Sequence, residues 1–328
     1  MVQSTNEIVI GIDGGGTHTR IMVVDLTGNV LAYLENGGSS IYKDLHAREN
    51  VQSAIKGAVR QAGRSMRDVQ ALTAGIAGFD SAADLEWVLP LTAIEGLECL
   101  KQHVNDAVVA HSGALLTEPG IIVISGTGSI IYAVTEEGQQ IRNYDLHHYA
   151  ASAARFLAYD ATFELLSGNI DDSDHELVNA ILQFWNQSTV KELSQLALQG
   201  FVVDQRERNR KFAQIAPSVT VAAADNSKLA KRVCDRAIHQ IMTGVEMLAS
   251  YFSNAEVNVS LVGSVVNSDY FQERLTSLLS EGNNKKYRLI KPTFSPVAGA
   301  ALLALKQLNI PIEKELLQNL SLHPRSQN

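Results

Sequence analysis

The sequence has few of the residues on which disulfide-stapled, metal-clustered and nucleic-acid-binding proteins depend. Only two cysteines, Cys99 and Cys234, occur in 328 residues, which excludes a disulfide scaffold and a structural zinc cluster. No apolar run approaches the length that a transmembrane helix needs. The net charge is −8, from 27 basic and 35 acidic residues, and the basic residues form no stripe. Nucleic acid and anionic membrane are therefore not expected partners.

Targeting and linker segments are also missing. The polar residues 1–7 lack the apolar core of a signal peptide, so a cytoplasmic protein is expected. No proline-rich or low-complexity stretch marks a linker. Because 328 residues exceed the usual size of a single core, and 45% of them are hydrophobic, we expect two lobes with an ordinary core each.

A glycine-rich turn near the N-terminus is the most informative segment that is present. The apolar run 8–10 leads into it and a second run, 21–24, follows, which predicts a strand, a tight turn and a returning strand. Consecutive glycines let backbone N–H groups close on an anion, and Asp13 at the strand end can hold hydrated Mg²⁺ beside phosphates. An ordinary hairpin is the alternative, but it needs one or two glycines rather than three. The predicted phosphate-binding residues are Gly14, Gly15, Gly16 and Thr17.

The same arrangement recurs about a hundred residues later. Residues 120–125 read as a strand and residues 130–134 as the returning strand, and in both copies a glycine turn then leads to a third strand. Two such units in one chain indicate a duplicated fold. The turn between these strands supplies the second set of predicted phosphate-binding residues: Gly126, Thr127, Gly128 and Ser129.

The paired hairpins resemble those of the sugar kinase, Hsp70 and actin superfamily. Within it, the chain resembles the BadF/BadG/BcrA/BcrD ATPase family, on its N-acetylglucosamine kinase-like branch. The order and spacing of several short segments carry this resemblance: 11–17, 75–78, 104–107, 124–129, 212–224, 262–265 and 295–300. It implies an α/β, two-lobed, actin-like ATPase fold of duplicated ribonuclease H-like domains, with a nucleotide cleft between the lobes.

The hairpins and the resemblance together divide the chain. Residues 1–116 and 295–328 are expected to form lobe I, to which the last helix returns, and residues 117–294 to form lobe II. Apolar periodicity predicts further elements. These are a helix at 47–62, a strand at 71–78, helical residues at 85–91, a helix-rich region at 149–252, a strand at 257–262, a small-residue helix at 297–305 and a disordered tail at 320–328.

The resemblance implies ATP and Mg²⁺ as cofactors. Gly263 and Ser264 follow the strand at 257–262, where the family usually has two glycines on which adenosine packs. A simple Gly-Ser turn between a strand and a helix is the alternative interpretation.

Asp106 is the candidate catalytic residue. It stands where a short strand ends and a helix of small residues begins. A carboxylate in that place can cap the helix. In the kinases that the chain resembles, the matching Asp is the general base that takes the proton of the attacking sugar hydroxyl. The two roles are compatible.

The acceptor site is expected near the same residues. Ser40 stands where the kinases have an Asn that binds sugar hydroxyls, and Asp80 could reach the same pocket or instead cap a helix near Ser81. The residues predicted to bind the acceptor are Ser39, Ser40, Gly78, Asp80, Asn105, Asp106 and Ser125.

Residues 142–155 depart most from the family pattern. N-acetylglucosamine kinases have Gly-Gly-Trp-Gly and then Gly-Asp-Glu-Gly-Ser there, and this chain has neither the Trp nor the Asp-Glu pair. Either the acceptor differs or the acceptor side has decayed while nucleotide binding remains. His147 and His148 lie here, but adjacent histidines without other ligands at useful spacing are usually loop residues.

Three classes of function remain open. The first is an ATP-dependent kinase of an amino sugar or related small polar acceptor. The second is a nucleotide-binding regulator without turnover. The third is an ATPase activator of a radical dehydratase, which is disfavoured because neither Cys99 nor Cys234 sits in a glycine-rich loop that could hold an iron–sulfur cluster. Relatives are commonly homodimers, so a homodimer is expected.

Overall fold

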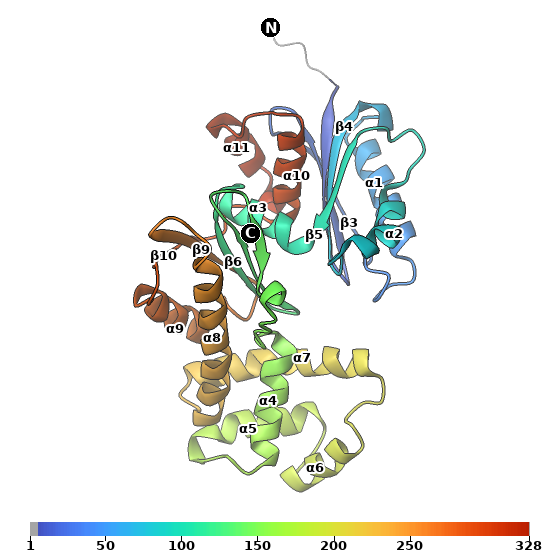
Figure 1. Ribbon diagram of the computed structural model, residues 1–328. Helices are drawn as coiled ribbons and strands as arrows, with labels where there is room; N and C mark the ends of the chain where they lie inside the picture. The colour runs from blue at the N-terminus through green and yellow to red at the C-terminus, as the bar shows by residue number, and fades with distance from the viewer. Residues whose placement is uncertain (1–5, 328) are drawn as a thin grey trace. The chain divides into compact units, whose positions relative to one another are not determined.

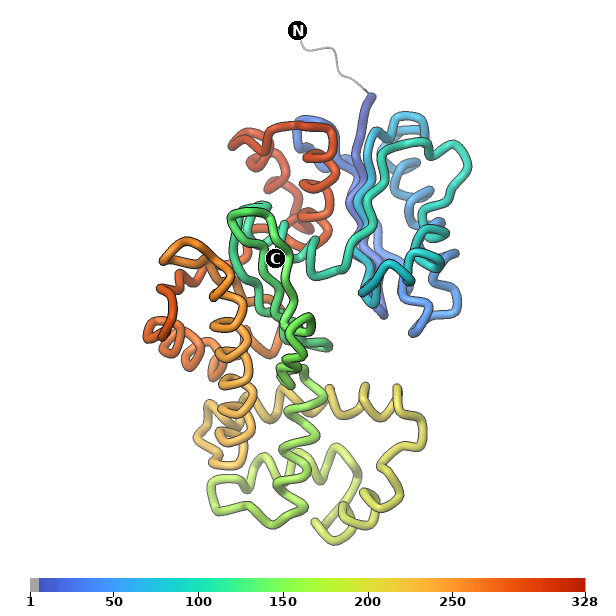
Figure 2. The backbone as a smooth tube through the Cα atoms, viewed as in Figure 1, coloured from blue at the N-terminus to red at the C-terminus, as the bar shows by residue number. Residues whose placement is uncertain are grey.

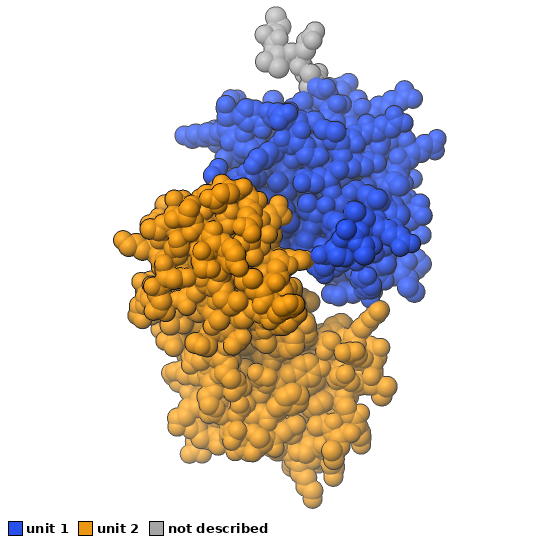
Figure 3. Space-filling model, viewed as in Figure 1, with its two compact units in different colours: residues 1–118, 291–328 blue, residues 119–290 orange. Residues whose placement is uncertain are grey.

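Two five-stranded sheets organise residues 6–327, the part of the chain that this computed structural model describes (Figure 1). Contacts divide these residues into two units, coloured separately in Figure 3. Unit 1 comprises residues 6–118 and 291–327, and unit 2 comprises residues 119–290. Each unit contains one of the two sheets.

The sheet of unit 1 has the strand order β3-β2-β1-β4-β5. Its strands are β1 (Ile8–Gly14), β2 (Thr19–Asp25), β3 (Val30–Asn36), β4 (Val69–Ile76) and β5 (Leu100–Asn105). The first three are antiparallel neighbours, whereas β1, β4 and β5 run parallel. The carboxyl ends of β1, β4 and β5 therefore meet at one edge of the sheet.

Helices cover both faces of this sheet, which explains why β1 is apolar at nearly every position. Ile8, Ile10 and Ile12 face a core shared with α1 (Ala47–Gln61), and Val9 faces a core shared with α10 (Pro296–Gln307). Chain segments from the two ends of the sequence therefore pack together, as the blue and red traces of unit 1 show (Figure 2). The remaining helical segments of unit 1 are η1 (Met66–Asp68), η2 (Ala82–Asp84), α2 (Leu85–Val88), η3 (Leu89–Thr92), α3 (Asp106–Leu115), α11 (Lys314–Ser321) and η6 (Pro324–Ser326).

Glycine permits the close approach of α10. A Cβ built on Gly11 of β1 would lie 2.5 Å from the backbone nitrogen of Ala301, and one on Gly299 would lie 2.1 Å from the carbonyl oxygen of Val109. These contacts leave no room for a side chain. The small-residue helix expected at 297–305 is thus the helix that packs on β1 and α3.

The sheet of unit 2 repeats this pattern with the strand order β8-β7-β6-β9-β10. Its strands are β6 (Gly120–Ser125), β7 (Ser129–Val134), β8 (Gln140–Arg142), β9 (Glu256–Val262) and β10 (Lys286–Leu289). As in unit 1, an antiparallel trio is extended by two parallel strands. The expected two-lobed α/β fold of duplicated units is confirmed.

A helical region is inserted between β8 and β9 of unit 2 and packs in one continuous apolar core. Cys234 is fully buried in its helix α8, as the apolar spacing around it predicts. The helical segments of unit 2 are η4 (Asn143–Leu146), α4 (Ala154–Leu166), η5 (Asp172–Asp174), α5 (His175–Phe184), α6 (Val190–Leu198), α7 (Gln205–Ala224), α8 (Lys228–Ala249) and α9 (Asp269–Ser280).

One expectation about local structure was wrong, and a second holds with a change of helix type. The tail predicted to be disordered is folded as far as the description extends, through residue 327, because Leu316 and Leu320 of α11 bury against the α10 side of the sheet. The helical residues expected at 85–91 are present: α2 (Leu85–Val88) continues without a break as the 3-10 helix η3 (Leu89–Thr92), in which Pro90 lacks the N–H that an α-helical bond would use.

No helix within residues 6–327 combines the length and the apolar character that crossing a membrane requires.

Candidate active site

Three of the predicted site segments follow the parallel strands of unit 1. In the sheet register, Gly14 of β1 pairs with Ile76 of β4, and Ile76 pairs with Asn105 of β5. The same edge of the sheet therefore carries three features: Asp13, Asp106 and the loop that begins at Ala77. Crevices at the carboxyl ends of parallel strands are the usual binding place in α/β folds.

Asp106 is the first residue of α3, and Asn105 is its N-cap. The side-chain oxygen of Asn105 accepts a hydrogen bond from the backbone N–H of Ala107, at 2.9 Å. The interpretation of Asp106 as the capping residue is therefore wrong. The backbone N–H groups of Ala107 and of Asp106 itself also interact with the Asp106 carboxylate, and these hydrogen bonds oppose the rise in its pKa that burial causes.

The surroundings of Asp106 disfavour its charged form. Burial, followed by the negative charges of Asp13 and Asp80, raises the pKa of Asp106 to about 6. A carboxylate with that pKa is ionised at pH 7 and is a stronger base than an ordinary aspartate. This combination suits a general base at neutral pH.

Asp13 pairs with a residue that sequence reasoning missed. The Nη1 of Arg20 donates to Asp13 Oδ2 at 3.0 Å, directly across the β1–β2 hairpin. Burial raises the pKa of Asp13, whereas the charge and hydrogen bond of Arg20 oppose that rise. The cross-strand register could have revealed this pair, since the two residues flank the glycine turn symmetrically.

The loop after β4 is hydrogen-bonded to Asn105 at the N-terminus of α3. The side-chain nitrogen of Asn105 donates to the carbonyl of Phe79 and to Asp80, both at 3.1 Å. Ser81, rather than Asp80, caps the following 3-10 turn η2, so the capping interpretation of Asp80 is wrong. The exposed carboxylate of Asp80 stands beside Asn105 instead.

Residues 37–44 wrap around the first glycine turn. Ser39 is fully buried and its hydroxyl donates to the carbonyl of Gly15, so it supports the turn. Ser40 is also buried, and its Oγ would lie 3.7 Å from a Cβ built on Gly78. The predicted acceptor residues Ser40 and Gly78 are thus brought together.

An aromatic pair borders this place and was not anticipated from the sequence. The ring of Tyr42 lies 3.6 Å from the Cβ position of Gly78 and meets Trp87 edge-to-face, with ring centroids 5.7 Å apart. Tyr42 remains half exposed. Such an exposed ring beside polar groups is typical of a surface that a sugar ring contacts.

The predicted nucleotide residues of unit 2 also come together. The N–H of Val265, just after Gly263 and Ser264, donates to the carbonyl of Ser125 at 3.0 Å. A Cβ built on Gly126 would lie 3.5 Å from the nitrogen of Ser264. Gly263 has a φ of +109°, and a Cβ there would lie 2.5 Å from the carbonyl oxygen of Ser125, so glycine is required.

Ser125 itself is fully buried. Its hydroxyl donates to the carbonyl of Ser152 at 2.6 Å, within unit 2. The structure thus gives this predicted acceptor residue a role in joining β6 to the segment that precedes α4.

The segment that departs from the family pattern is packed against the second glycine turn. The hydroxyl of Tyr144 donates to the carbonyl of Ser129, and the hydroxyl of Ser129 donates to the carbonyl of Ala150. Arg155 donates to the carbonyl of Thr127 at 3.2 Å. A guanidinium therefore stands at this turn.

Binding of a divalent metal ion at this site would depend on Asp13. Among the described residues, no group of three histidine, cysteine, aspartate or glutamate side chains could hold a metal ion. Mg²⁺ commonly uses one or two carboxylates and completes its shell with phosphate oxygens and water. The carboxylate of Asp13 beside the glycine turn fits that kind of site.

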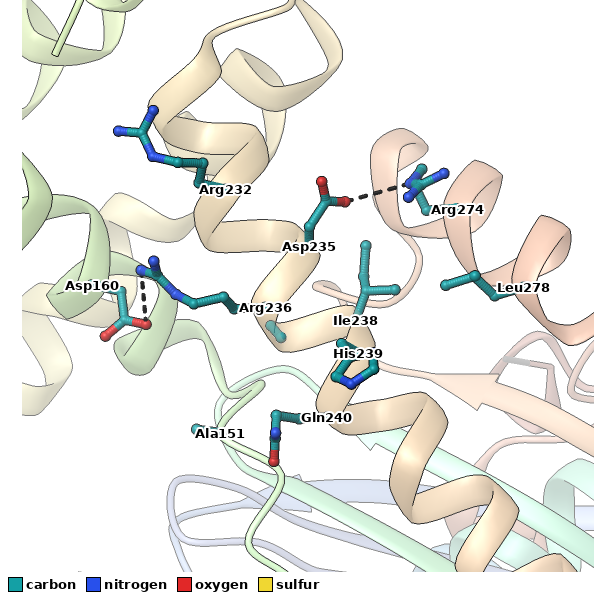
Figure 4. A pocket seen from close by; sticks show the side chains of 11 residues that line it. Ala151, Asp160, Arg232, Asp235, Arg236, Ile238, His239, Gln240, Arg274 and Leu278 are labelled. Carbon is teal, nitrogen blue, oxygen red and sulfur yellow. Dashed lines mark hydrogen bonds and ion pairs between the residues drawn. The ribbon is translucent and has the colours of Figure 1, made fainter. Parts of the chain in front are cut away.

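A cavity of about 800 Å³ lies elsewhere in unit 2, among α4, α8 and α9 (Figure 4). Its arginines are paired with carboxylates: Arg236 with Asp160 at 3.6 Å and Arg274 with Asp235 at 3.4 Å. None of the residues predicted to bind nucleotide or acceptor lines it. The glycine turns and the carboxylates therefore identify the candidate site better than cavity size does.

Comparison with known proteins agrees with these features. A model of the BadF/BadG/BcrA/BcrD ATPase family matches residues 10–304. An N-acetylmuramic acid/N-acetylglucosamine kinase of Clostridium acetobutylicum is 26% identical over 90% of this chain and 97% of its own length. An N-acetyl-D-glucosamine kinase of Dictyostelium discoideum is 26% identical over 92% of this chain and 98% of its own length.

A solved structure shows the same fold. A Chromobacterium violaceum protein, solved as a candidate N-acetylglucosamine kinase, superposes with a TM-score of 0.70 at 24% identity. The match covers 91% of this chain and 99% of that protein.

Proposed function

Because this chain belongs to the BadF/BadG/BcrA/BcrD ATPase family, we propose that it transfers the γ-phosphoryl group of ATP to a hydroxyl of an amino sugar or related small polar acceptor. One observation carries the proposal: Asp106, with its pKa raised to about 6, stands at the same sheet edge as Asp13 and the first glycine turn. Kinase relatives in two organisms match nearly the whole chain.

Unit 1 and unit 2 each supply contacts to the nucleotide in this proposal. The backbone N–H groups of both glycine turns, with the hydroxyls of Thr17, Thr127 and Ser129, bind phosphate oxygens. Gly263 and Ser264 receive the adenosine. Asp13 would hold Mg²⁺, which neutralises phosphate charge when it is bound.

Asp106 removes the proton from the acceptor hydroxyl as that oxygen attacks the γ-phosphorus. A new bond forms between the acceptor oxygen and phosphorus, while the bond between phosphorus and the β–γ bridging oxygen breaks. The electron pair of the broken bond leaves with ADP. The proton stays on Asp106 until it is released to water.

The acceptor is proposed to differ from that of an N-acetylglucosamine kinase. Ser40 replaces the sugar-binding Asn, and Ala150 and Ala151 stand in the region where that branch has its Asp-Glu pair. A site that hydrogen-bonds a hydroxyl discriminates strongly, since a buried polar partner left unpaired costs about 1–3 kcal/mol. Ser40, Asp80 and Asn105 in unit 1 then carry most of the acceptor's hydrogen bonds.

A regulator that binds nucleotide without turnover is the second candidate. The missing Asp-Glu pair favours it, because the acceptor side could have decayed alone. The dehydratase activator is not favoured, since Cys234 is fully buried and Cys99 is half-buried on the unit 1 core.

One assay separates these candidates. ADP release from MgATP is measured with a panel of sugars, amino sugars and sugars derived from muropeptides, and nucleotide binding is measured by calorimetry. Acceptor-dependent ADP release supports the kinase. Nucleotide binding without release for any acceptor supports the regulator, and absence of both contradicts the proposal.

A further inference from the structure

Residues 37–44 form a strap that closes over the first glycine turn. The backbone N–H of Ser39 donates to the carbonyl of Gly15 at 3.0 Å, and Thr19 Oγ1 donates to the carbonyl of Gly37 at 2.8 Å. Asp44 completes the strap by accepting from the N–H of Gly38. The strap therefore holds its side chains in a defined relation to the turn.

The strap lays the side chain of Lys43 over Gly16. A Cβ built on Gly16 would lie 2.2 Å from Cδ and 2.8 Å from Nζ of Lys43. A side chain at position 16 would therefore have to displace the flexible end of the lysine. The absence of a side chain at Gly16 thus leaves room for this contact.

Lys43 has no counter-ion among the described residues, unlike Arg20 at the same glycine turn. Within residues 6–327 its ammonium group has no hydrogen bond or ion pair, and it stands exposed. Arg20, the other cation at the turn, is held by Asp13. A lysine without a counter-ion beside a glycine turn is a ready ligand for an anion.

The charges around the turn favour such a cation. Asp13, Asp80 and Asp106 give this edge of unit 1 three carboxylates against the single guanidinium of Arg20. A nucleotide polyphosphate adds further negative charge to the same place. Backbone N–H groups contribute only partial charges, so a full positive charge in addition to that of the metal strengthens phosphate binding.

We propose that Lys43 binds the β- or γ-phosphate oxygens of the nucleotide at the first glycine turn and is a catalytic residue for phosphoryl transfer. This inference rests on the proposed function. Lysine acts as a point charge toward phosphate, as it does in other phosphate sites. Its charge balances the negative charge that develops on the bridging oxygen as ADP leaves.

Lys43 also connects the phosphate site to the acceptor site. Its backbone N–H donates to the carbonyl of Ser40 at 2.9 Å, so the two residues share one tight turn, with Tyr42 between them. In this proposal the strap therefore places residues for both substrates within eight positions of the chain.

The test compares Lys43→Met and Lys43→Arg with the control Lys56→Met, which removes an exposed lysine from the solvent side of α1. Calorimetry measures binding of ADP and of AMP to each full-length protein, and steady-state assays give kcat and KM for ATP. Lys43→Met should weaken ADP binding about 10- to 100-fold, the effect of losing a hydrogen bond to a charged group, and should leave AMP binding unchanged. Lys43→Arg should retain most of the affinity, and Lys56→Met should match the wild type.

Wild-type ADP affinity in Lys43→Met would overturn the inference, and so would an equal loss of AMP affinity, which would indicate a structural role. The melting temperature of each variant identifies misfolding. If Lys43→Met misfolds, Lys43→Gln serves in its place. Failure of the wild-type protein to bind MgADP is a different result, and it would remove the proposed function itself.

Discussion

The two glycine turns have similar sequences but very different surroundings. In the first turn, a Cβ on Gly14 would lie 2.4 Å from the hydroxyl of Ser39, and Lys43 fills the space beside Gly16. In the second turn, a Cβ on Gly126 would meet nothing closer than 3.5 Å, and one on Gly128 would meet nothing within 4 Å. Glycine is therefore needed for packing in the first turn, whereas the second turn leaves open space.

The turns differ in charge as well. The first stands with Asp13 and Asp106 and with the cations Arg20 and Lys43, whereas the guanidinium of Arg155 stands at the second. Proton transfer and metal binding need ionisable groups, which unit 1 supplies. In the proposed function, one of these two similar turns therefore carries the chemistry and the other mainly holds phosphate.

Replacing Asp106 should have the largest effect. If Asp106 is the general base, Asp106→Asn should lower kcat by about 10²- to 10⁴-fold while nucleotide affinity changes little. The wild-type kcat/KM should fall as the pH drops through about 6, because the base becomes protonated. Rate measurements between pH 5 and 8 check both points, and an active Asn variant would assign the chemistry elsewhere.

The same variant should be more stable at neutral pH. The folded-state pKa of Asp106 is raised above its ordinary value, so its contribution to stability is full below about pH 4 and is lost as the pH rises through about 6. Asp106→Asn should therefore raise the free energy of unfolding by roughly 1–3 kcal/mol at pH 7.5 and by little at pH 4. Denaturant titration at the two pH values measures this, and a variant equally stable at both would contradict it.

Asp13→Asn should have the next largest effect on activity, because Asp13 is proposed to hold Mg²⁺. Removing one carboxylate ligand weakens Mg²⁺ binding, so the loss of activity should be relieved in part by a higher Mg²⁺ concentration. Calorimetry with ADP at increasing Mg²⁺ provides a readout independent of turnover. A loss that no Mg²⁺ concentration changes would mean that Asp13 serves only to hold Arg20.

Sequence reasoning reached the features that short contiguous segments encode. The glycine turns, Asp106 and the buried position of Cys234 each follow from a few neighbouring residues, and the repeat of the turn indicated two similar sheets. Asn105 was expected to bind the acceptor, yet its role as the cap of α3 was not anticipated. Asn105 was assigned to the acceptor site because it directly precedes Asp106.

What the sequence did not reveal depends on contacts between distant segments. Lys43 meets Gly16 only because the strap at residues 37–44 folds back, and no local pattern marks that contact. The C-terminal helix α11 was missed because its eight residues are marginal by themselves. Its stability comes from burying Leu316 and Leu320 on a sheet formed by the other end of the chain.

Alanine in the two turns should separate packing from binding. Gly14→Ala should lower the free energy of unfolding by about 1–3 kcal/mol, because Ser39 and Ile76 crowd the added methyl group. Gly128→Ala should change it by less than about 0.5 kcal/mol, since the space is open. Chemical unfolding without nucleotide gives both values, and equal destabilisation would show that the turns are packed alike.

The smallest effect is expected at Arg155, the counterpart of Lys43 in the second turn. Its guanidinium is already engaged, donating to the carbonyl of Thr127 and lying 4.2 Å from the centroid of the Phe156 ring. Arg155→Met should therefore raise the KM for ATP by only about two- to fivefold, the range of a solvent-screened charge, and the difference should shrink at high salt. Arg206→Met, which removes an exposed arginine from α7, serves as the matched control. Lys43 has no counter-ion within residues 6–327, so its full charge is available to the nucleotide. Lys43→Met should therefore weaken nucleotide binding more than Arg155→Met does. If Arg155→Met weakens ADP binding more than Lys43→Met does, the second turn is the main electrostatic contact with the nucleotide, and the division of roles between the two turns is reversed.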